Sequence, residues 1–282
     1  MLQYLLTCHL MLTPTSGIIA TRTGALYSES FCPAAPRGVV LITHGYAEHC
    51  GRYHELANIL VGAGWAVQTY DVRGHGKSPG PRGYIDRFAT YIGDFEAAKA
   101  QARTLCPSGP LVVLGHSNGG LITLAALVGG AKADAAVISS PFLGLKLAVS
   151  PIKRLLGRIA SVVYPGLTLP APLDVAALTS DPAKQQARRS DALCFDIATA
   201  RWFTEAANAQ RSVAQGIETL TMPSLWLIGG ADKIADADAS VRIAKRAPQA
   251  TVHRLAGMQH EVFNETDRAG VFTTTTEYLK SI

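Results

Sequence analysis

The sequence lacks the features that would place it among membrane-spanning or disordered proteins. No apolar run reaches the roughly 18–20 residues that a membrane-spanning helix needs. Charged residues make up only 17% of the 282 residues and hydrophobic residues 48%, whereas disordered chains are highly charged and poor in apolar residues. Glycine and proline, at 26 and 15 residues, are too few for a collagen-like or low-complexity chain. These absences leave a globular protein with a sizeable core.

Cysteine motifs and blocks of like charge are also missing. The five cysteines are widely spaced without a C-x-x-C motif, so neither a disulfide framework nor a thiolate zinc site is expected, and a reducing, cytoplasmic location is the default. The net charge of +5 comes from cations spread along the chain, which argues against nucleic-acid binding. Residues 1–10 lack a basic region and a clean cleavage site, so they match a signal peptide poorly.

Apolar runs rich in Val, Ile and Leu alternate with segments of helical periodicity. Continuous apolar strands are typical of parallel sheets covered on both faces, and the alternation predicts a doubly wound, mostly parallel α/β sheet. A leading hairpin that turns at Gly24 is expected before it. The expected strands are Ile18–Thr23, Ala25–Phe31, Gly38–Gly45, Trp65–Tyr70, Leu111–Leu114, Ala135–Ile138, Leu225–Ile228 and Thr251–Leu255.

The alternation is interrupted once, between residues 141 and 217. This stretch shows helical pattern and prolines without a convincing strand, and it is too long for an ordinary connection. We therefore expect a helical cap over residues 141–217, inserted into a core of residues 11–140 and 218–282, with residues 1–10 as a separate extension. Such a cap would cover the carboxyl ends of the strands, where α/β sheets bind ligands.

The motif G-x-S-x-G, typical of a nucleophilic serine, occurs twice. Ser117 lies in the copy that has an expected strand before it and a helix after it, which is the context of a nucleophile elbow. Ser78 lies in the other copy and is followed by Pro79, which has no N–H to donate to an oxyanion. Ser117 is therefore the predicted nucleophile, and Ser78 is expected to be a turn residue.

Two competing motifs fail at single positions. The segment that ends in Gly76-Lys-Ser imitates a phosphate-binding P-loop, but Asp71 stands where that motif needs its first glycine. His260 and Glu261 imitate the start of the zinc-protease motif H-E-x-x-H, but Asn264 replaces the second histidine. Neither nucleotide binding nor zinc proteolysis is predicted, and no metal or organic cofactor is expected.

A serine nucleophile needs a base and an acid, which in α/β-hydrolases follow it in the order acid, then histidine. Only His253 and His260 lie downstream of Ser117. His253 falls inside an expected strand and His260 in the loop after it, so His260 is the predicted base. Asp232, at the end of the preceding strand, is the predicted acid. Two rival acids fit the start of a helix better: Asp236 and Asp238.

The backbone N–H groups of Tyr46 and Asn118 are the predicted oxyanion donors. Asn118 follows the nucleophile directly, and Tyr46 lies in the loop after the Gly38–Gly45 strand. His44 in the same loop is expected to support the loop rather than to take part in catalysis.

Five segments, in order, resemble the monoacylglycerol lipases and their lysophospholipase-like relatives. Residues 44–53 resemble the HGxxEHxxRY block of that family, and residues 71–78 resemble its D-x-R-G-H-G-x-S block. The elbow at residues 115–120 and the acid and base segments at residues 230–234 and 260–265 are similar as well. Together the segments span nearly the whole chain.

This resemblance implies an α/β-hydrolase fold with a helical cap and the hydrolysis of long-chain esters, of the monoacylglycerol or lysophospholipid kind, through an acyl-enzyme. Relatives usually have Met where Asn118 stands. Because the oxyanion donor is a backbone N–H, catalysis is expected to survive this change, whereas acyl specificity is left open. The alternatives are a short-chain carboxylesterase, thioesterase or peptidase on the same fold, or a catalytically silent binding module.

One helix of the expected cap has a one-sided apolar stripe. Ser150 suits its N-cap, Pro151 its first turn, and Pro165-Gly166 its end. The stripe is predicted to line the acyl pocket, because a long-chain ester needs an apolar tunnel. Docking at a lipid interface is the second interpretation, since the opposite face carries cations without acids, and plain packing on the core is the third. The stripe residues assigned to the pocket are Ile152, Leu155, Leu156 and Ile159.

Overall fold

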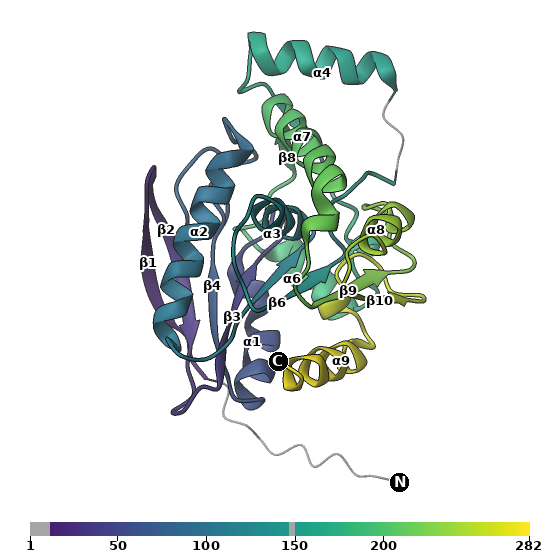
Figure 1. The fold of residues 1–282 in the computed structure, drawn as a ribbon. Coiled ribbons are helices and arrows are strands. Elements are labelled where there is room, and N and C mark those ends of the chain that lie inside the picture. The colour runs from purple at the N-terminus through teal and green to yellow at the C-terminus, as the bar shows by residue number, and fades with distance from the viewer. Residues whose placement is uncertain (1–11, 147–149) are drawn as a thin grey trace.

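The core of the protein is an eight-stranded sheet in the order β1-β2-β4-β3-β5-β6-β9-β10 (Figure 1). The computed structural model describes residues 12–146 and 150–282, so the expected extension over residues 1–10 lies outside the described residues. β2 pairs antiparallel with both β1 and β4, and all other neighbouring strands pair parallel, which confirms the predicted fold class. The strands are β1 (Thr15–Thr21), β2 (Gly24–Phe31), β3 (Gly38–Thr43), β4 (Trp65–Tyr70), β5 (Leu111–His116), β6 (Ala135–Ser139), β9 (Ser224–Gly229) and β10 (Ala250–Leu255).

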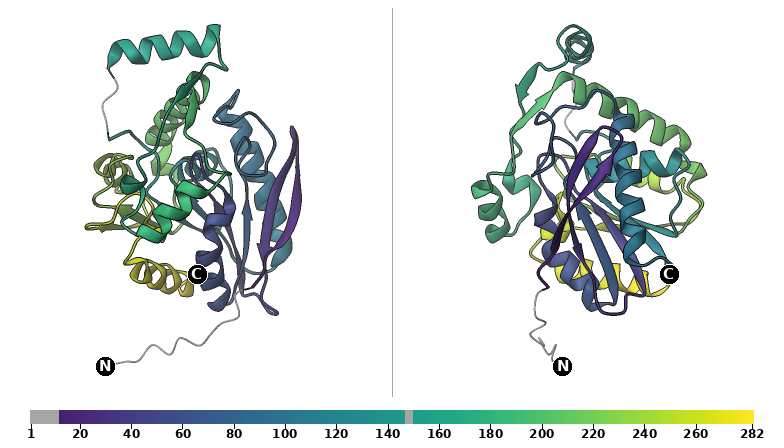
Figure 2. Two further views of the ribbon diagram at one scale, coloured as in Figure 1. Left: turned by 180° about the vertical axis from the view of Figure 1, so that it is seen from behind. Right: turned by 90° about the vertical axis from the view of Figure 1, so that its left-hand side faces the viewer.

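Helices cover both faces of this sheet because successive side chains of a strand point to opposite sides. Val39 and Leu41 of β3 belong to one buried cluster, with α2 (Phe88–Leu105), α3 (Asn118–Val128) and α8 (Ala237–Ala244). Val40 and Ile42 belong to the other, with the helices α1 (His54–Gly62) and α9 (Arg268–Lys280). The views from behind and from the side show the same two layers (Figure 2). A strand buried on both faces has no polar side, which is why the sequence shows continuous apolar runs.

The chain between β6 and β9 forms the part expected to be a cap. The prediction of no strand there is wrong, because two three-residue strands pair antiparallel across it. Strands this short are not long enough to produce an alternating pattern in the sequence. The elements are α4 (Pro151–Val163), β7 (Thr168–Pro170), α5 (Val175–Leu178), α6 (Pro182–Ser190), β8 (Ile197–Thr199), α7 (Ala200–Gly216) and the 3-10 helix η2 (Ile217–Thr219). Two further 3-10 turns lie in the core, η1 (Cys50–Tyr53) and η3 (Val262–Asn264).

Helix α4 lies at the far end of the molecule from α9, against α7 (Figures 1 and 2). It turns the small Ser161, which is 1% exposed, inward and its large apolar residues outward. The stripe residues are 51–71% exposed and do not line the cavity described below, so the pocket-lining prediction is wrong in this structure: Ile152, Leu155, Leu156 and Ile159. In the described part of the chain, no helix is both long and apolar enough to cross a bilayer.

Candidate active site

Ser117 occupies a sharp turn between β5 and α3. Its φ of 51° and ψ of −116° are unusual for a residue with a side chain, and such strain is typical of functional positions. A β-carbon on Gly115 would meet the Thr123 hydroxyl at 2.5 Å, and one on Gly119 would overlap the carbonyl oxygen of Thr43 on β3. The two glycines of G-x-S-x-G are therefore required by the closeness of the elbow to its neighbours.

The structure brings the three predicted catalytic side chains together at the carboxyl ends of the strands. His260 Nε2 lies 2.8 Å from Ser117 Oγ, and His260 Nδ1 lies 2.7 Å from Asp232 Oδ2. All three residues are buried. Asp232 Oδ1 accepts hydrogen bonds from the backbone N–H groups of Ile234 and Ala235, so the loop that follows β9 fixes the carboxylate that orients the imidazole.

The charge of Asp232 controls the protonation of His260. Burial alone would lower the pKa of His260, but the adjacent Asp232 charge and its hydrogen bond outweigh burial and hold that pKa above its ordinary value. Burial would likewise raise the pKa of Asp232, whereas the histidine and the two backbone donors keep it lowered. The pair is thus arranged to stabilise an imidazolium next to a carboxylate, which a serine hydrolase needs after proton transfer.

The predicted oxyanion donors belong to two segments that meet at the serine, since a β-carbon on Gly45 would lie 3.3 Å from that of Ser117. Within the described part of the chain, the backbone N–H groups of Tyr46 and Asn118 have no hydrogen-bond acceptor. Asn118 is the first residue of α3, whose positive end adds to the attraction for an anion. The neighbouring Gly45 N–H, in contrast, donates a hydrogen bond to Glu48 Oε1 at 2.6 Å, and this contact holds the Tyr46 loop in place.

The residues that the sequence analysis considered but did not assign to catalysis have structural roles or lie outside the site. Ser78 accepts a hydrogen bond from Tyr27 N–H at 2.9 Å and donates one to the Asp71 carbonyl at 2.6 Å, as expected of a turn residue. His44 donates from Nδ1 to the Gly45 carbonyl and accepts from Val72 N–H, so it ties the Tyr46 loop to the end of β4. The remaining candidates also lie outside the site: His253 is exposed on β10, and Asp236 caps α8 through Ala239 N–H.

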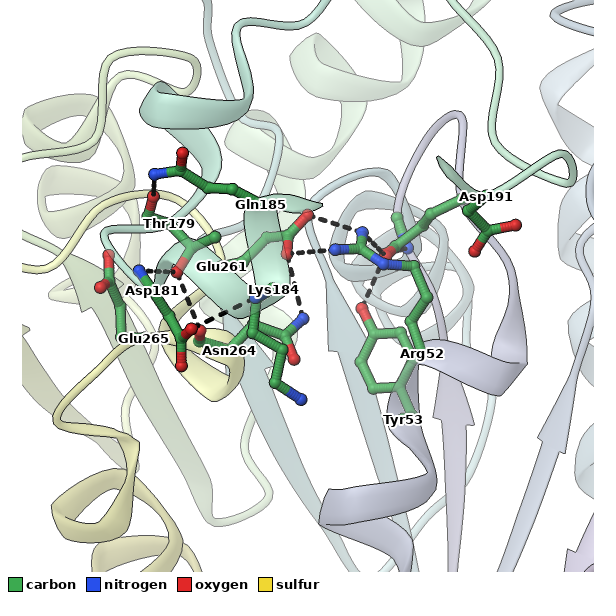
Figure 3. A network of polar contacts seen from close by, with 12 residues as sticks. Arg52, Tyr53, Thr179, Asp181, Lys184, Gln185, Asp191, Glu261, Asn264 and Glu265 are labelled. Atoms are coloured by element: carbon green, nitrogen blue, oxygen red, sulfur yellow. Dashed lines mark hydrogen bonds and ion pairs between the residues drawn. The ribbon is translucent and has the colours of Figure 1, made fainter. Parts of the chain in front are cut away.

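A buried ionic cluster beside the site was not predicted from the sequence. Arg52 donates to Glu48 and to both carboxylate oxygens of Glu261, each at 2.7 Å (Figure 3). Glu48 also accepts from Tyr53 Oη at 2.8 Å. Glu48, Arg52 and Tyr53 all lie in the HGxxEHxxRY-like block, and Glu261 directly follows the predicted base. The charged residues of that block were therefore the sequence feature from which the cluster could have been predicted. The cluster holds the Tyr46 loop and the His260 loop together.

A mostly apolar cavity opens over Ser117 and His260. Its charged lining residues are Glu48, Arg52 and Glu261 from the core and Arg188 from the cap. Trp202 and Phe142 stack with ring centres 5.9 Å apart on the apolar side. The apolar lining comes from both core and cap: Phe142, Leu145, Ala171, Leu173, Leu178, Ala198, Trp202, Phe203 and Ile234.

Comparisons with known proteins agree with this geometry. The family model described as serine aminopeptidase, S33, matches residues 34–267. Monoacylglycerol lipase of Mycolicibacterium smegmatis is 32% identical over 253 residues, which cover 87% of this chain and 89% of that protein. The chain is a monoacylglycerol lipase-like α/β-hydrolase of the S33 family. As a member of this family it is a serine ester hydrolase, in agreement with the prediction from sequence.

Other relatives of this hydrolase are lipolytic as well. Phospholipase YtpA of Bacillus subtilis is 30% identical over 245 residues, covering 84% of this chain and 93% of that protein. The crystal structure of Paleococcus ferrophilus monoacylglycerol lipase superposes with a TM-score of 0.83 at 27% identity, covering 91% of this chain and 98% of that one. A soluble variant of monoglyceride lipase from Saccharomyces cerevisiae shares the fold, with a TM-score of 0.86 at 21% identity over 96% of both chains.

One group of metal-ligand side chains in the described residues of this hydrolase lies close together. Donor atoms of His49, Asp191 and Cys194 are within 4.8 Å of one another. His49 Nε2 already donates to Asp191 Oδ2 at 2.7 Å, and burial raises the pKa of the Cys194 thiol to about 12. We therefore interpret the group as a hydrogen bond between the core and the C-cap of α6, with a protonated cysteine beside it.

Proposed function

We propose that this hydrolase cleaves long-chain acyl esters of glycerol or of glycerol-based lipids, with Ser117 as nucleophile. The observation that carries the proposal is the position of Ser117, hydrogen-bonded to His260, at the floor of a cavity lined mainly by apolar side chains. Such a cavity suits an acyl chain, and the polar wall suits the alcohol. Residues 141–217 act as the cap that supplies Trp202 and Phe203 to this cavity.

Acylation begins when Ser117 Oγ attacks the ester carbonyl and His260 Nε2 takes the hydroxyl proton. The carbonyl oxygen becomes an oxyanion that accepts hydrogen bonds from the N–H groups of Tyr46 and Asn118. Asp232 stabilises the imidazolium. His260 then gives its proton to the leaving alcohol as the acyl–oxygen bond breaks, and the acyl group remains on Ser117.

Deacylation repeats these steps with water. His260 takes a proton from a water molecule, the resulting hydroxide attacks the acyl carbonyl, and the proton returns to Ser117 Oγ as the fatty acid leaves. The chain's own groups supply each proton transfer and each charge stabilisation, so this route uses no further group.

Active-site labelling tests the nucleophile. A fluorophosphonate should modify Ser117, as located by peptide mass spectrometry, and the Ser117→Ala variant should resist labelling and lose several orders of magnitude in kcat. Ser78→Ala is the matched control and should label normally. A modified Ser78, or full labelling of Ser117→Ala, would refute the assignment. An unlabelled wild-type protein would instead favour a silent binding module.

Substrate class is tested with a chain-length series of p-nitrophenyl esters and monoacylglycerols, together with an amino acid p-nitroanilide. We expect higher kcat/KM for long chains and no amidase activity. An aminopeptidase needs a free carboxylate to bind the substrate ammonium group, whereas Glu48 and Glu261 are both engaged by Arg52. A preference for acetyl or butyryl esters would support the short-chain esterase alternative.

We also propose that α4 docks on a lipid surface, the second interpretation of its stripe. Its outward residues are more than half exposed, among them Val162 at 76% and Val163 at 77%, and the exposed Arg158 lies on the same helix. An amphipathic helix with cations and exposed aliphatic side chains suits an anionic interface. Co-sedimentation with vesicles should therefore increase with phosphatidylglycerol content and fall in Leu156→Asp. Equal pelleting of both proteins, or none with any vesicle, would refute the docking.

A further inference from the structure

Arg188, near the carboxyl end of α6, is a cation on the wall of the cavity. It is 7% exposed and lines the cavity over Ser117. Its guanidinium donates no hydrogen bond within the described part of the chain. The nearest carboxylate, on the largely exposed Asp196, is 3.9 Å away, which is beyond hydrogen-bond distance. A guanidinium has five N–H donors, and those of Arg188 remain free to bind a ligand in the cavity.

The acidic side chains of the cavity wall are not available to Arg188. Every carboxylate oxygen of Glu48 and Glu261 accepts a hydrogen bond from Arg52, Tyr53, Gly45 N–H or Asn264. Neither carboxylate lies within 4.0 Å of the Arg188 guanidinium. The donors of Arg188 are therefore open toward the cavity.

The backbone that carries Arg188 is fixed by polar contacts on both sides. Lys184, one turn earlier in α6, forms an ion pair with Glu55 of α1 at 2.7 Å. At the start of the helix, Asp181 pairs with Arg268 at 2.9 Å. Just beyond its end, Asp191 bonds to His49. Because the backbone is already fixed, only the Arg188 side chain has to be ordered when it binds a ligand.

We propose that Arg188 is a specificity-determining residue that binds a monoanionic phosphodiester in the alcohol half of the substrate, so that lysophospholipids are preferred over neutral monoacylglycerols. This inference rests on the proposed ester hydrolysis at Ser117. A guanidinium binds phosphate oxygens through paired N–H donors. Glu48 and Glu261 line the same cavity and repel a second negative charge, so a monoanionic phosphodiester is favoured over a doubly charged phosphomonoester.

The test compares two soluble substrates with the same acyl group, 1-octanoylglycerol and 1-octanoyl-glycero-3-phosphoglycerol. Both are used as monomers, so that membrane binding by α4 does not contribute. The wild type should show the higher kcat/KM on the phosphodiester. Arg188→Gln should lose about 10- to 100-fold on it, mainly through KM, and keep its rate on the neutral ester. Arg188→Lys, which retains the charge, should recover part of the loss.

The matched control is Arg189→Gln, which removes the same charge from an exposed neighbouring position. It should leave both rates unchanged. Equal losses on both substrates in Arg188→Gln, or a wild type that cleaves only the neutral ester, would overturn the phosphodiester site while leaving the hydrolase proposal intact. Hydrolysis of neither substrate would instead refute the proposed function.

A measurement on the wild type covers the case in which Arg188→Gln does not fold. Glycero-3-phosphoglycerol should inhibit the cleavage of octanoylglycerol competitively, at concentrations where glycerol itself does not. Glycerol 3-phosphate, with its second charge, should inhibit less. Absence of inhibition by the phosphodiester, or stronger inhibition by the phosphomonoester, would overturn the proposal.

Discussion

The α-carbon of Gly119 faces the carbonyl oxygen of Thr43 so closely that an added β-carbon would overlap that oxygen. The contact joins the first turn of α3 to the end of β3, and so it ties the serine elbow to the loop that carries Tyr46. A side chain at position 119 must push these two elements apart, and both proposed oxyanion donors move with them.

Gly119→Ala should therefore reduce kcat by at least about 100-fold, as expected when an oxyanion donor is displaced. The matched control is Gly93→Ala in α2, where an added β-carbon meets nothing within 4 Å. That variant should be fully active and about 0.5–1 kcal/mol more stable. Steady-state kinetics and urea unfolding measure both effects. A Gly119→Ala enzyme with normal kcat would contradict the close contact.

The pH dependence of activity should report the raised pKa of His260. A protonated imidazole cannot accept the Ser117 proton, so activity falls as the pH drops through this pKa. Because Asp232 holds it above its ordinary value of 6.5, the acid limb of kcat/KM should lie above pH 6.5. Burial lowers the pKa of His116 to about 4, so that residue adds no limb nearby.

Asp232→Asn should move this acid limb to lower pH and reduce kcat by about 10³- to 10⁴-fold. Asp236→Asn, which alters the rival acid four residues later, is the control and should leave the limb in place. An unchanged limb in Asp232→Asn would show that another group controls His260.

Removing Arg52 should strongly destabilise the protein. Arg52→Ala leaves Glu48 and Glu261 buried without their counter-charge, which is expected to cost about 3–5 kcal/mol in the free energy of unfolding. Arg254→Ala breaks an ion pair that is about half exposed on both sides and should cost at most about 1 kcal/mol. Urea unfolding curves give both values. Equal costs would mean that the buried cluster contributes no more than a surface pair.

The cost of Arg52→Ala should also depend on pH. Burial would raise the pKa of Glu48, but the charge of Arg52 overrides it and keeps that pKa lowered in the folded protein. A lowered pKa contributes stability above the unfolded value near 4.5, and the contribution is lost as the pH falls. The difference between wild type and Arg52→Ala should therefore shrink below about pH 4.5.

Asn118 offers a route to a more stable enzyme. Its side chain is fully buried, and neither amide atom has a hydrogen-bond partner in the described part of the chain. An unsatisfied buried amide costs about 1–3 kcal/mol, so Asn118→Leu should raise the free energy of unfolding by a similar amount. Activity should persist, because the oxyanion donor is the backbone N–H. A less stable variant would indicate that the amide has a partner such as water.

The strand positions could be predicted from this sequence because they are determined by the residues of each strand itself, which form runs rich in apolar side chains. The strand Trp65–Tyr70 was predicted to the residue, because a strand buried on both faces is rich in apolar, β-branched and aromatic residues, and here Gln68 is the one exception. Ser117 could be chosen over Ser78 because Pro79 has no N–H. The order of strands, combined with the rule that ligands bind at their carboxyl ends, then placed Asp232 and His260 at the same edge as the serine.

The roles of cap residues could not be predicted, because they depend on packing between distant segments. Helical periodicity predicted the apolar stripe of α4, which includes Leu156. It could not predict which face of the helix packs against α7. The small Ser161 faces α7, and the stripe is exposed. Arg188 lies in no recognisable motif. In the structure it is buried whereas the neighbouring Arg189 is exposed, and nothing in the sequence distinguishes the two arginines.

The separation of Ser117 from His260 by 143 residues has a consequence during synthesis. At roughly 5–20 residues per second, a ribosome takes about 7–30 s to add the base after it has made the nucleophile. Throughout that interval the serine is present without the group that activates it. A nascent chain that exposes its elbow early therefore cannot hydrolyse the lipids it meets, and hydrolytic capacity arises in one step when the His260 loop closes onto the sheet.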